Sequence, residues 1–428
     1  MHELTELIRE DMRPALGVTE PGAIAFAVST ARKHTSGDIR KILLRLNSGM
    51  FKNAFTCGIP GSDQVGNYHA AALGAIAADP DKGLECLDGV TAEQDGQAKE
   101  MVKAGLVQVE MTEITSRIFI EATVQTSEGS ACVTIRDAHT NIVKIQENGA
   151  TVWEKPCEDG SHQEAVPTIH HFSLAQLREY ALTVPIDEIS FIRKAYDVNL
   201  SLFEAGLRSP RTTYAPYLLA ANGGKVISED EQKTASLLCN AAIEARVLGL
   251  PEAAMSITGS GAHGIIATMP LYASCQVKGY SEEMLLRATS LSYLVCMYIK
   301  EYSGKLSAFC GCAIAAGTGT ACGLTLLRGG SLEDMTRAIC NLASSITGMI
   351  CDGGNQGCTM KGVVAVDAVW RSVDMAMAGV SIDSVHGING ATPEETMRNM
   401  GRIASPGMVG TEKTIVEILA EKRPGKER

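Results

Sequence analysis

The residue pattern of this chain changes near residue 165, and that change limits the folds it can adopt. Between Leu106 and Gln146, the segments VQVEMTE, RIFIEATVQT, SACVTIR and NIVKIQ alternate apolar and polar residues and are rich in β-branched side chains, which is typical of strands. From Ser173 onward, long helical patterns follow one another, separated by glycine-rich connectors. The sequence therefore predicts an α+β fold: a mixed α/β domain with an antiparallel sheet over residues 1–165, then a larger all-α domain, rich in Gly and Ala, over residues 166–428.

The first domain should begin with helices. Residues 1–35 read as helix with a break near Gly17, where Thr19 is placed to cap the helix that follows. Residues 39–47 alternate well enough for a strand, and small residues around His69 to Ala78 predict another helix.

Charge and hydropathy exclude several classes of partner. The net charge of −11 leaves no basic face for a nucleic acid. The first residues, MHELTELIREDM, read as a charged amphipathic helix and not as a secretion signal. The longest apolar stretch, Cys312 to Leu327, is interrupted by Gly and Thr and is too short to span a bilayer. We therefore expect a soluble cytoplasmic protein without a membrane partner, and a homo-oligomer on symmetry statistics.

Cysteines are the most informative residues of the second half. There are 13, an odd number that disulfides explain poorly, and most free cysteines in proteins are buried core residues. Cys310 and Cys312 lie in FCGCAIAAG, and Cys351 and Cys358 lie in ICDGGNQGC. A loop of Gly and short polar residues offers N–H groups beside thiolates, which suits an iron–sulfur cluster. Zinc usually binds paired C-x-x-C motifs, which are absent here, although spacing alone leaves the metal open.

Two polar segments are further candidates. TGSGAHGI, from Thr258 to Ile265, is either an anion-binding helix start or an ordinary helix connector, and its glycine order fits no nucleotide-binding fingerprint. RDAHTNIVKI places His139, Thr140 and Asn141 in a polar turn between two strands, where a lone His is more often structural than catalytic.

Six sequence blocks together carry a family resemblance. GVTEPGAIAFA, LNSGMFKNAFTCGIPG, RDAHTNIV, TGSGAHGIIATMP, KLSAFCGC and GMICDGGNQGCTMK follow one another over essentially the whole chain. In this order they resemble the L-cysteine desulfidase family, which is related to the iron–sulfur L-serine dehydratases through their alpha-type catalytic domain. The resemblance implies a [4Fe–4S] cluster held by Cys310, Cys351 and Cys358, with the fourth iron open to substrate. Cys312 is a possible substitute for one of these three ligands.

The resemblance also implies a reaction. It predicts a lyase that performs β-elimination on a small L-amino acid, in the first place L-cysteine, which would yield pyruvate, ammonia and sulfide. The alternatives are dehydration of L-serine or another β-hydroxy amino acid, and a non-catalytic relative that binds the cluster or a ligand. The positions that match the family's substrate-binding segments are Thr19, Glu20, Lys52, Asn53, His139, Asn141, Ser260 and Gly261. Lys52 is the candidate to pair with a substrate carboxylate, the alternative being an ordinary solvated lysine.

The chain departs from the family pattern at two catalytic positions. Val18 stands where the family has a cysteine proposed as the base, and a valine accepts no proton. We hypothesise that Cys57, in FTCGIP, supplies the lost thiol, the alternative being a buried core residue. His263 stands in the Gly-rich loop as a group that titrates near neutrality and is able to protonate a leaving group.

Overall fold

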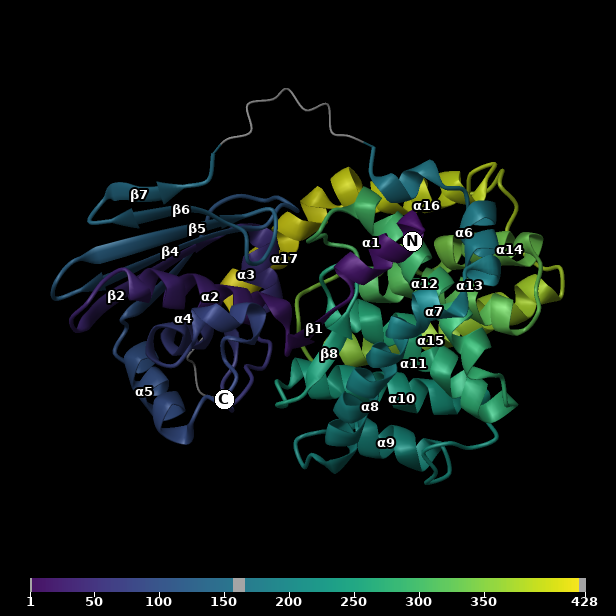
Figure 1. Cartoon of the computed structure of the whole chain (residues 1–428), viewed down its shortest axis with the longest axis horizontal. Coiled ribbons are helices and arrows are strands. Elements are labelled where there is room, and N and C mark those ends of the chain that lie inside the picture. The colour runs from purple at the N-terminus through teal and green to yellow at the C-terminus, as the bar shows by residue number, and fades with distance from the viewer. Residues whose placement is uncertain (1, 157–165, 423–428) are drawn as a thin grey trace.

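The computed structural model describes residues 2–156 and 166–422 and consists of a sheet with covering helices beside a larger helical body (Figure 1). The sheet has six strands in the order β3-β2-β4-β5-β6-β7. Its neighbours pair antiparallel except β2 and β3, which run parallel, so the sheet is mixed. The strands are β2 (Ile39–Leu46), β3 (Val107–Met111), β4 (Phe119–Thr126), β5 (Ser130–Arg136), β6 (Ile142–Glu147) and β7 (Ala150–Glu154).

Helices cover one face of this sheet. Alternate residues such as Ile42, Ile120 and Val133 are fully buried, because their side chains point to the face that α2 (Thr19–Lys33) covers. Beside α2 lies α4 (Gly66–Ile76), which contacts α2 and the strands β2 and β3, and α5 (Ala92–Lys103) packs against α4. The strand predictions and the α+β class are confirmed.

The helical body is built by close packing of small residues. A Cβ at Gly319 would lie 2.2 Å from the Ser292 carbonyl oxygen, and one at Gly206 would lie 2.4 Å from that of Ala241. No residue larger than glycine fits such contacts without moving a helix. The helices of this body are α6 (Leu174–Thr183), α7 (Ile186–Ile189), α8 (Arg193–Arg208), α9 (Tyr214–Ala221), α10 (Glu231–Val247), α11 (Gly261–Lys278), α12 (Glu282–Ser303), α13 (Gly317–Leu327), α14 (Leu332–Ile346), α15 (Gly357–Met377) and α16 (Pro393–Arg402).

Both ends of the chain cross between the two bodies. Helix α1 (Glu3–Asp11) packs on α12, and strand β1 (Arg13–Leu16) pairs antiparallel with β8 (Ala253–Ser256) of the helical body. At the other end, α17 (Val409–Glu421) packs against α3 (Ser48–Ala54) beside the sheet. The expected boundary at residue 165 falls at the edge of the segment outside the described residues, so the division into two domains stays a prediction.

One expectation for the first residues is wrong. The segment 13–16 is a strand and not helix, because it pairs with a segment about 240 positions away that local pattern does not reveal. Among residues 2–156 and 166–422, no helix combines the length and apolar character needed to cross a bilayer.

Candidate functional site

A cavity of about 200 Å³ lies where the two bodies meet. Its wall combines the first turn of α2, the turn between β5 and β6, the start of α11 and the cysteine segments. Both signs of charge are present on it. The lining residues with polar or sulfur-bearing side chains are Asp11, Glu20, Asn53, Asp137, His139, Arg246, Thr258, Ser260, His263, Lys300, Lys305, Ser307, Cys312, Cys351 and Cys358.

A short backbone pairing brings the two cysteine groups together. Phe309 and Ile350 form an isolated antiparallel bridge. Beside it, the Cys310 N–H donates to the Met349 carbonyl over 2.8 Å, and the Cys351 N–H donates to the Ala308 carbonyl over 2.6 Å. Cys310 and Cys351, about 40 positions apart in the sequence, are thus brought side by side next to the cavity.

The loop from Cys351 to Cys358 is fitted closely onto α3. Gly353 has φ +109°, and a Cβ there would lie 2.4 Å from the Lys52 carbonyl oxygen. The next N–H, of Gly354, donates to the Asn53 carbonyl over 3.0 Å. The adjacent glycines allow this approach, because a side chain would push the loop away from the helix.

Four thiols form one group, which we call the thiol group: Cys310, Cys312, Cys351 and Cys358. Cys312, Cys351 and Cys358 line the cavity, and Cys310 lies just behind them, 3% exposed. A hydrogen bond with the Cys312 thiol lowers the pKa of Cys310 to about 7. Burial and the neighbouring Cys351 and Cys310 raise the pKa of Cys358 to about 12. The structure thus brings together the three predicted ligands and the substitute.

Lysines surround the thiol group. Burial lowers the pKa of Lys300, and Cys296, Cys312 and Cys351 oppose that effect. Lys361 pairs with Asp352, and this pair together with Cys358 outweighs burial and raises the Lys361 pKa. Each lysine charge by itself favours thiolates and any anionic group that they hold, but burial outweighs this effect at Cys358 and raises its pKa.

The thiol group is a donor set of the kind that an iron–sulfur cluster requires. In the described part of the chain, no three His, Cys, Asp or Glu side chains converge closely enough to hold one metal ion. A zinc ion would need its ligands within about 2.3 Å of one centre. A four-iron cluster spreads its thiolates over separate corners, beside N–H groups such as those of the glycine-rich loop.

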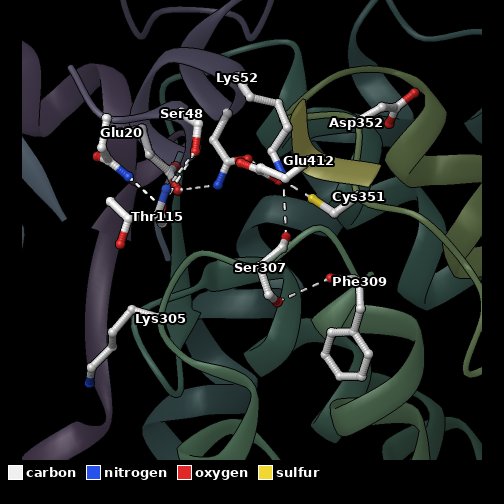
Figure 2. A network of polar contacts seen from close by, with 12 residues as sticks. Glu20, Ser48, Lys52, Thr115, Lys305, Ser307, Phe309, Cys351, Asp352 and Glu412 are labelled. Carbon is white, nitrogen blue, oxygen red and sulfur yellow. Dashed lines mark hydrogen bonds and ion pairs between the residues drawn. The ribbon is translucent and has the colours of Figure 1, made fainter. Parts of the chain in front are cut away.

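The structure does not leave Lys52 free for a substrate carboxylate. Its ammonium lies 2.7 Å from Oε2 of Glu412 in α17, and it also donates to the Ser307 carbonyl over 3.2 Å (Figure 2). The side chain is fully buried and is absent from the cavity wall. Burial lowers the Lys52 pKa, but Cys351 and Glu412 more than offset this and raise it. Lys52 therefore joins α17 to the segment that leads into Cys310.

His263 lies on the cavity wall, but it does not titrate near neutrality as expected. Burial, together with the charges of Lys300 and Arg246, lowers the pKa of His263 well below its usual value. Its Nδ1 shares a 2.5 Å hydrogen bond with Oγ1 of Thr258, and a Cβ at Gly311 would lie 2.7 Å from its Nε2. A neutral imidazole is a weak acid, so the structure does not support its predicted role as proton donor to a leaving group.

Cys57 lies behind the cavity wall. A Cβ at Gly354 would lie 3.0 Å from Val18 Cγ1 and 3.4 Å from Cys57 Cβ, so both residues border the cysteine loop. However, Val18 lines the cavity and Cys57 does not. The Cys57 thiol is fully buried, donates to the Ala54 carbonyl over 3.5 Å, and has a pKa that burial raises well above the usual value. This environment favours the alternative, a buried core cysteine.

The predicted substrate-binding residues divide into two sets. Glu20, Asn53, His139 and Ser260 line the cavity, and the Asn53 amide donates to Glu20 Oε1 over 2.9 Å. The Asn53 oxygen lies 3.9 Å from the Cys351 sulfur. Four residues lie outside the wall. Besides Lys52, they are Thr19, whose hydroxyl donates to the Gly259 carbonyl; Gly261, which packs on Arg246; and Asn141, whose amide donates to the Arg136 carbonyl within its hairpin turn.

Sequence reasoning did not single out five charged residues of the wall: Asp11, Asp137, Arg246, Lys300 and Lys305. Arg246 was detectable, because NAAIEARVLG consists of small and apolar residues apart from Asn240, Glu244 and Arg246, and a charge in such a helical segment needs a reason. Asp11, whose carboxylate accepts the Thr258 N–H, and Lys300 belong to amphipathic helices in which any charged residue appears solvent-exposed.

Comparison with known proteins gives a consistent family. The sequence model of the serine dehydratase alpha chain matches residues 81–417. A UPF0597 protein of Clostridium botulinum is 40% identical over 430 residues and covers 98% of both chains. UPF0597 proteins of Caldanaerobacter subterraneus and Aeromonas hydrophila are each 34% identical, over 98% of this chain and 98% and 96% of their own. The resemblance to relatives of the dehydratase catalytic domain is confirmed, and the chain belongs to the serine dehydratase alpha chain family, which points to a lyase.

Proposed function

We propose that this protein is an iron–sulfur lyase that performs β-elimination on a small L-amino acid. The observation that carries the proposal is the thiol group on the wall of a small cavity that also presents carboxylates and cations. An amino acid bears one carboxylate and one ammonium, so it needs both signs of charge close together. The family assignment and the six sequence blocks support the same reaction class.

The proposed ligands are Cys310, Cys351 and Cys358, which would hold a [4Fe–4S] cluster. Such a cluster, when bound, supplies a Lewis-acidic iron beside the substrate. Cys312 lies on the cavity wall and in hydrogen-bonding contact with Cys310, so it is the nearest substitute for a ligand. The surrounding lysines offset the negative charge that several thiolates would place in one buried spot.

The chain's own residues would then bind the substrate and move its proton. Glu20, held by the Asn53 amide, suits a substrate ammonium. For the base, His139 is better placed than Cys57, since it lines the cavity and its Nε2 is buried without a hydrogen-bond partner. Burial lowers the pKa of His139, so the imidazole is neutral at physiological pH and able to accept the Cα proton.

L-Cysteine remains the first candidate substrate, on the sequence resemblance. L-Serine is the second candidate, because the family that the chain belongs to is described by its serine dehydratase alpha chain. The two substrates differ only in the leaving group, and the same base and the same charges on the cavity wall serve both.

The test is an assay of anaerobically purified protein with its iron content measured. We expect pyruvate from L-cysteine with an equal amount of sulfide. Pyruvate from L-serine alone would make the protein a dehydratase. No pyruvate from either substrate by iron-loaded protein would contradict the lyase and favour a non-catalytic relative, and a colourless protein containing zinc would contradict the cluster.

A further inference from the structure

Arg246 is a buried cation for which the described part of the chain supplies no ion-pair partner. It lies in the last turn of α10, is 5% exposed, and lines the cavity. Its Nε is buried and makes no hydrogen bond. Within residues 2–156 and 166–422, no carboxylate forms an ion pair with its guanidinium. The other cavity cations differ: Lys300 donates to the Gly304 carbonyl over 2.8 Å, and Lys305 is exposed.

An unpaired guanidinium at this depth needs an anion. Removing a charge from water is costly unless hydrogen bonds or an opposite charge replace the lost hydration. The carboxyl end of α10 offsets part of this cost, because the negative end of a helix favours a cation. That field leaves the N–H donors of the guanidinium unused, and these donors match a carboxylate in two parallel hydrogen bonds.

The packing around Arg246 places it at the start of α11. A Cβ at Gly261 would lie 2.7 Å from Arg246 Nε and 3.1 Å from its Cδ. The glycine therefore leaves room for the arginine beside the first turn of α11, where Ser260 and His263 line the same cavity. Free N–H groups at that helix start and the arginine together form a positive region.

We infer that Arg246, beside the first turn of α11, binds the α-carboxylate of the small amino-acid substrate. This inference rests on the proposed function for the identity of the ligand, but its observations are separate, since they do not involve the thiol group. It gives Arg246 the role that sequence analysis assigned to Lys52. The carboxylate would lie at the α11 side of the cavity and the ammonium near Glu20 of α2.

The test is calorimetric binding of L-alanine to anaerobically purified, iron-loaded protein. L-Alanine has both charged groups and no β leaving group, so it binds without reacting. We expect Arg246→Gln to weaken binding about 10- to 100-fold, the usual effect of losing a charged hydrogen bond. Arg246→Lys keeps the charge but loses the paired donors, so its affinity for L-alanine should lie between those of the wild type and Arg246→Gln. This second variant guards against a folding defect in Arg246→Gln. Ethylamine, which lacks the carboxylate, should bind weakly and equally to all three proteins.

Lys278→Gln is the matched control, because it removes an exposed cation at the far end of α11, outside the cavity wall, and should change L-alanine binding less than about threefold. An equal loss in the Lys278 and Arg246 variants would overturn the inference, as would unchanged binding in both Arg246 variants or no binding by the wild type. If no amino acid is turned over but L-alanine binding still depends on Arg246, the carboxylate site stands and the lyase proposal fails.

Discussion

The buried ion pair between Lys52 and Glu412 gives the sharpest prediction for stability. The ammonium and carboxylate are 2.7 Å apart, and their side chains are 0% and 6% exposed. Removing one partner of a buried pair costs about 3–5 kcal/mol, because the other charge stays buried. In Glu412→Gln, Lys52 keeps its hydrogen bond to the Ser307 carbonyl, so we expect about 3 kcal/mol, the lower end of that range.

This cost should appear as weaker docking of α17. Glu412 lies in the first turn of α17, which packs against α3, so the lost free energy favours opening of that helix. At about 1.4 kcal/mol per factor of ten, amide hydrogen exchange across residues 409–421 should become roughly 100-fold faster. Hydrogen–deuterium exchange with mass spectrometry, on protein kept under nitrogen, measures this rate.

Two variants make the result interpretable. Glu417→Gln removes a charge from the same helix, but its pair with Lys413 is 3.9 Å long and more than half exposed, so a change of at most about 1 kcal/mol is expected. The double variant Lys52→Met/Glu412→Leu removes both buried charges and should recover most of the protection. Equal exchange rates in the Glu412 and Glu417 variants would refute the reasoning.

Three further predictions concern the site. Gly354→Ala places a Cβ 2.9 Å from the Asn53 carbonyl oxygen, so it should lower the free energy of unfolding by about 1–3 kcal/mol and reduce the iron content. Gly348→Ala is the control, because its Cβ meets open space and should change neither quantity. Thermal unfolding and iron assays measure both. Cys310→Ser should lose iron after anaerobic reconstitution, while Cys312→Ser should retain it; the reverse result would make Cys312 the ligand. Burial lowers the pKa of His139 below the usual value of about 6.5. The rate of pyruvate formation should therefore be constant near neutrality and decline only at lower pH, as the imidazole gains a proton. His139→Gln should reduce kcat about 10²- to 10⁴-fold and abolish that decline.

The strands and helices whose residues show a clear local pattern of apolar and polar side chains were predicted from the sequence. The strands from Val107 to Glu147 show an alternation that a one-sided sheet requires, so they were predictable. Strand β1 was not, because four residues that include Pro14 carry little pattern and their partner lies in β8. The cysteine segments were recognisable from their glycine-rich surroundings, but the bridge between Phe309 and Ile350 that joins them depends on tertiary folding.

The residues around the cavity were only partly predictable for a related reason. Sequence blocks identify residue types, and four of the residues that they single out, Glu20, Asn53, His139 and Ser260, lie on the wall. They do not reveal which charge already has a partner. Lys52 was assigned to substrate because its sequence gives no sign of Glu412, 360 positions later. Arg246 was overlooked although the structure leaves it unpaired.

The pairing of segments from opposite ends of the chain also orders events during synthesis. Ribosomes add roughly 5–20 residues per second, so Glu412 follows Lys52 by some tens of seconds. During that interval α3 has no carboxylate partner for its lysine, and the last thiol of the thiol group, Cys358, is itself made long after Lys52. A nascent chain cannot present the complete thiol group until Cys358 has been added, and we expect the proposed cluster to be inserted only after that point.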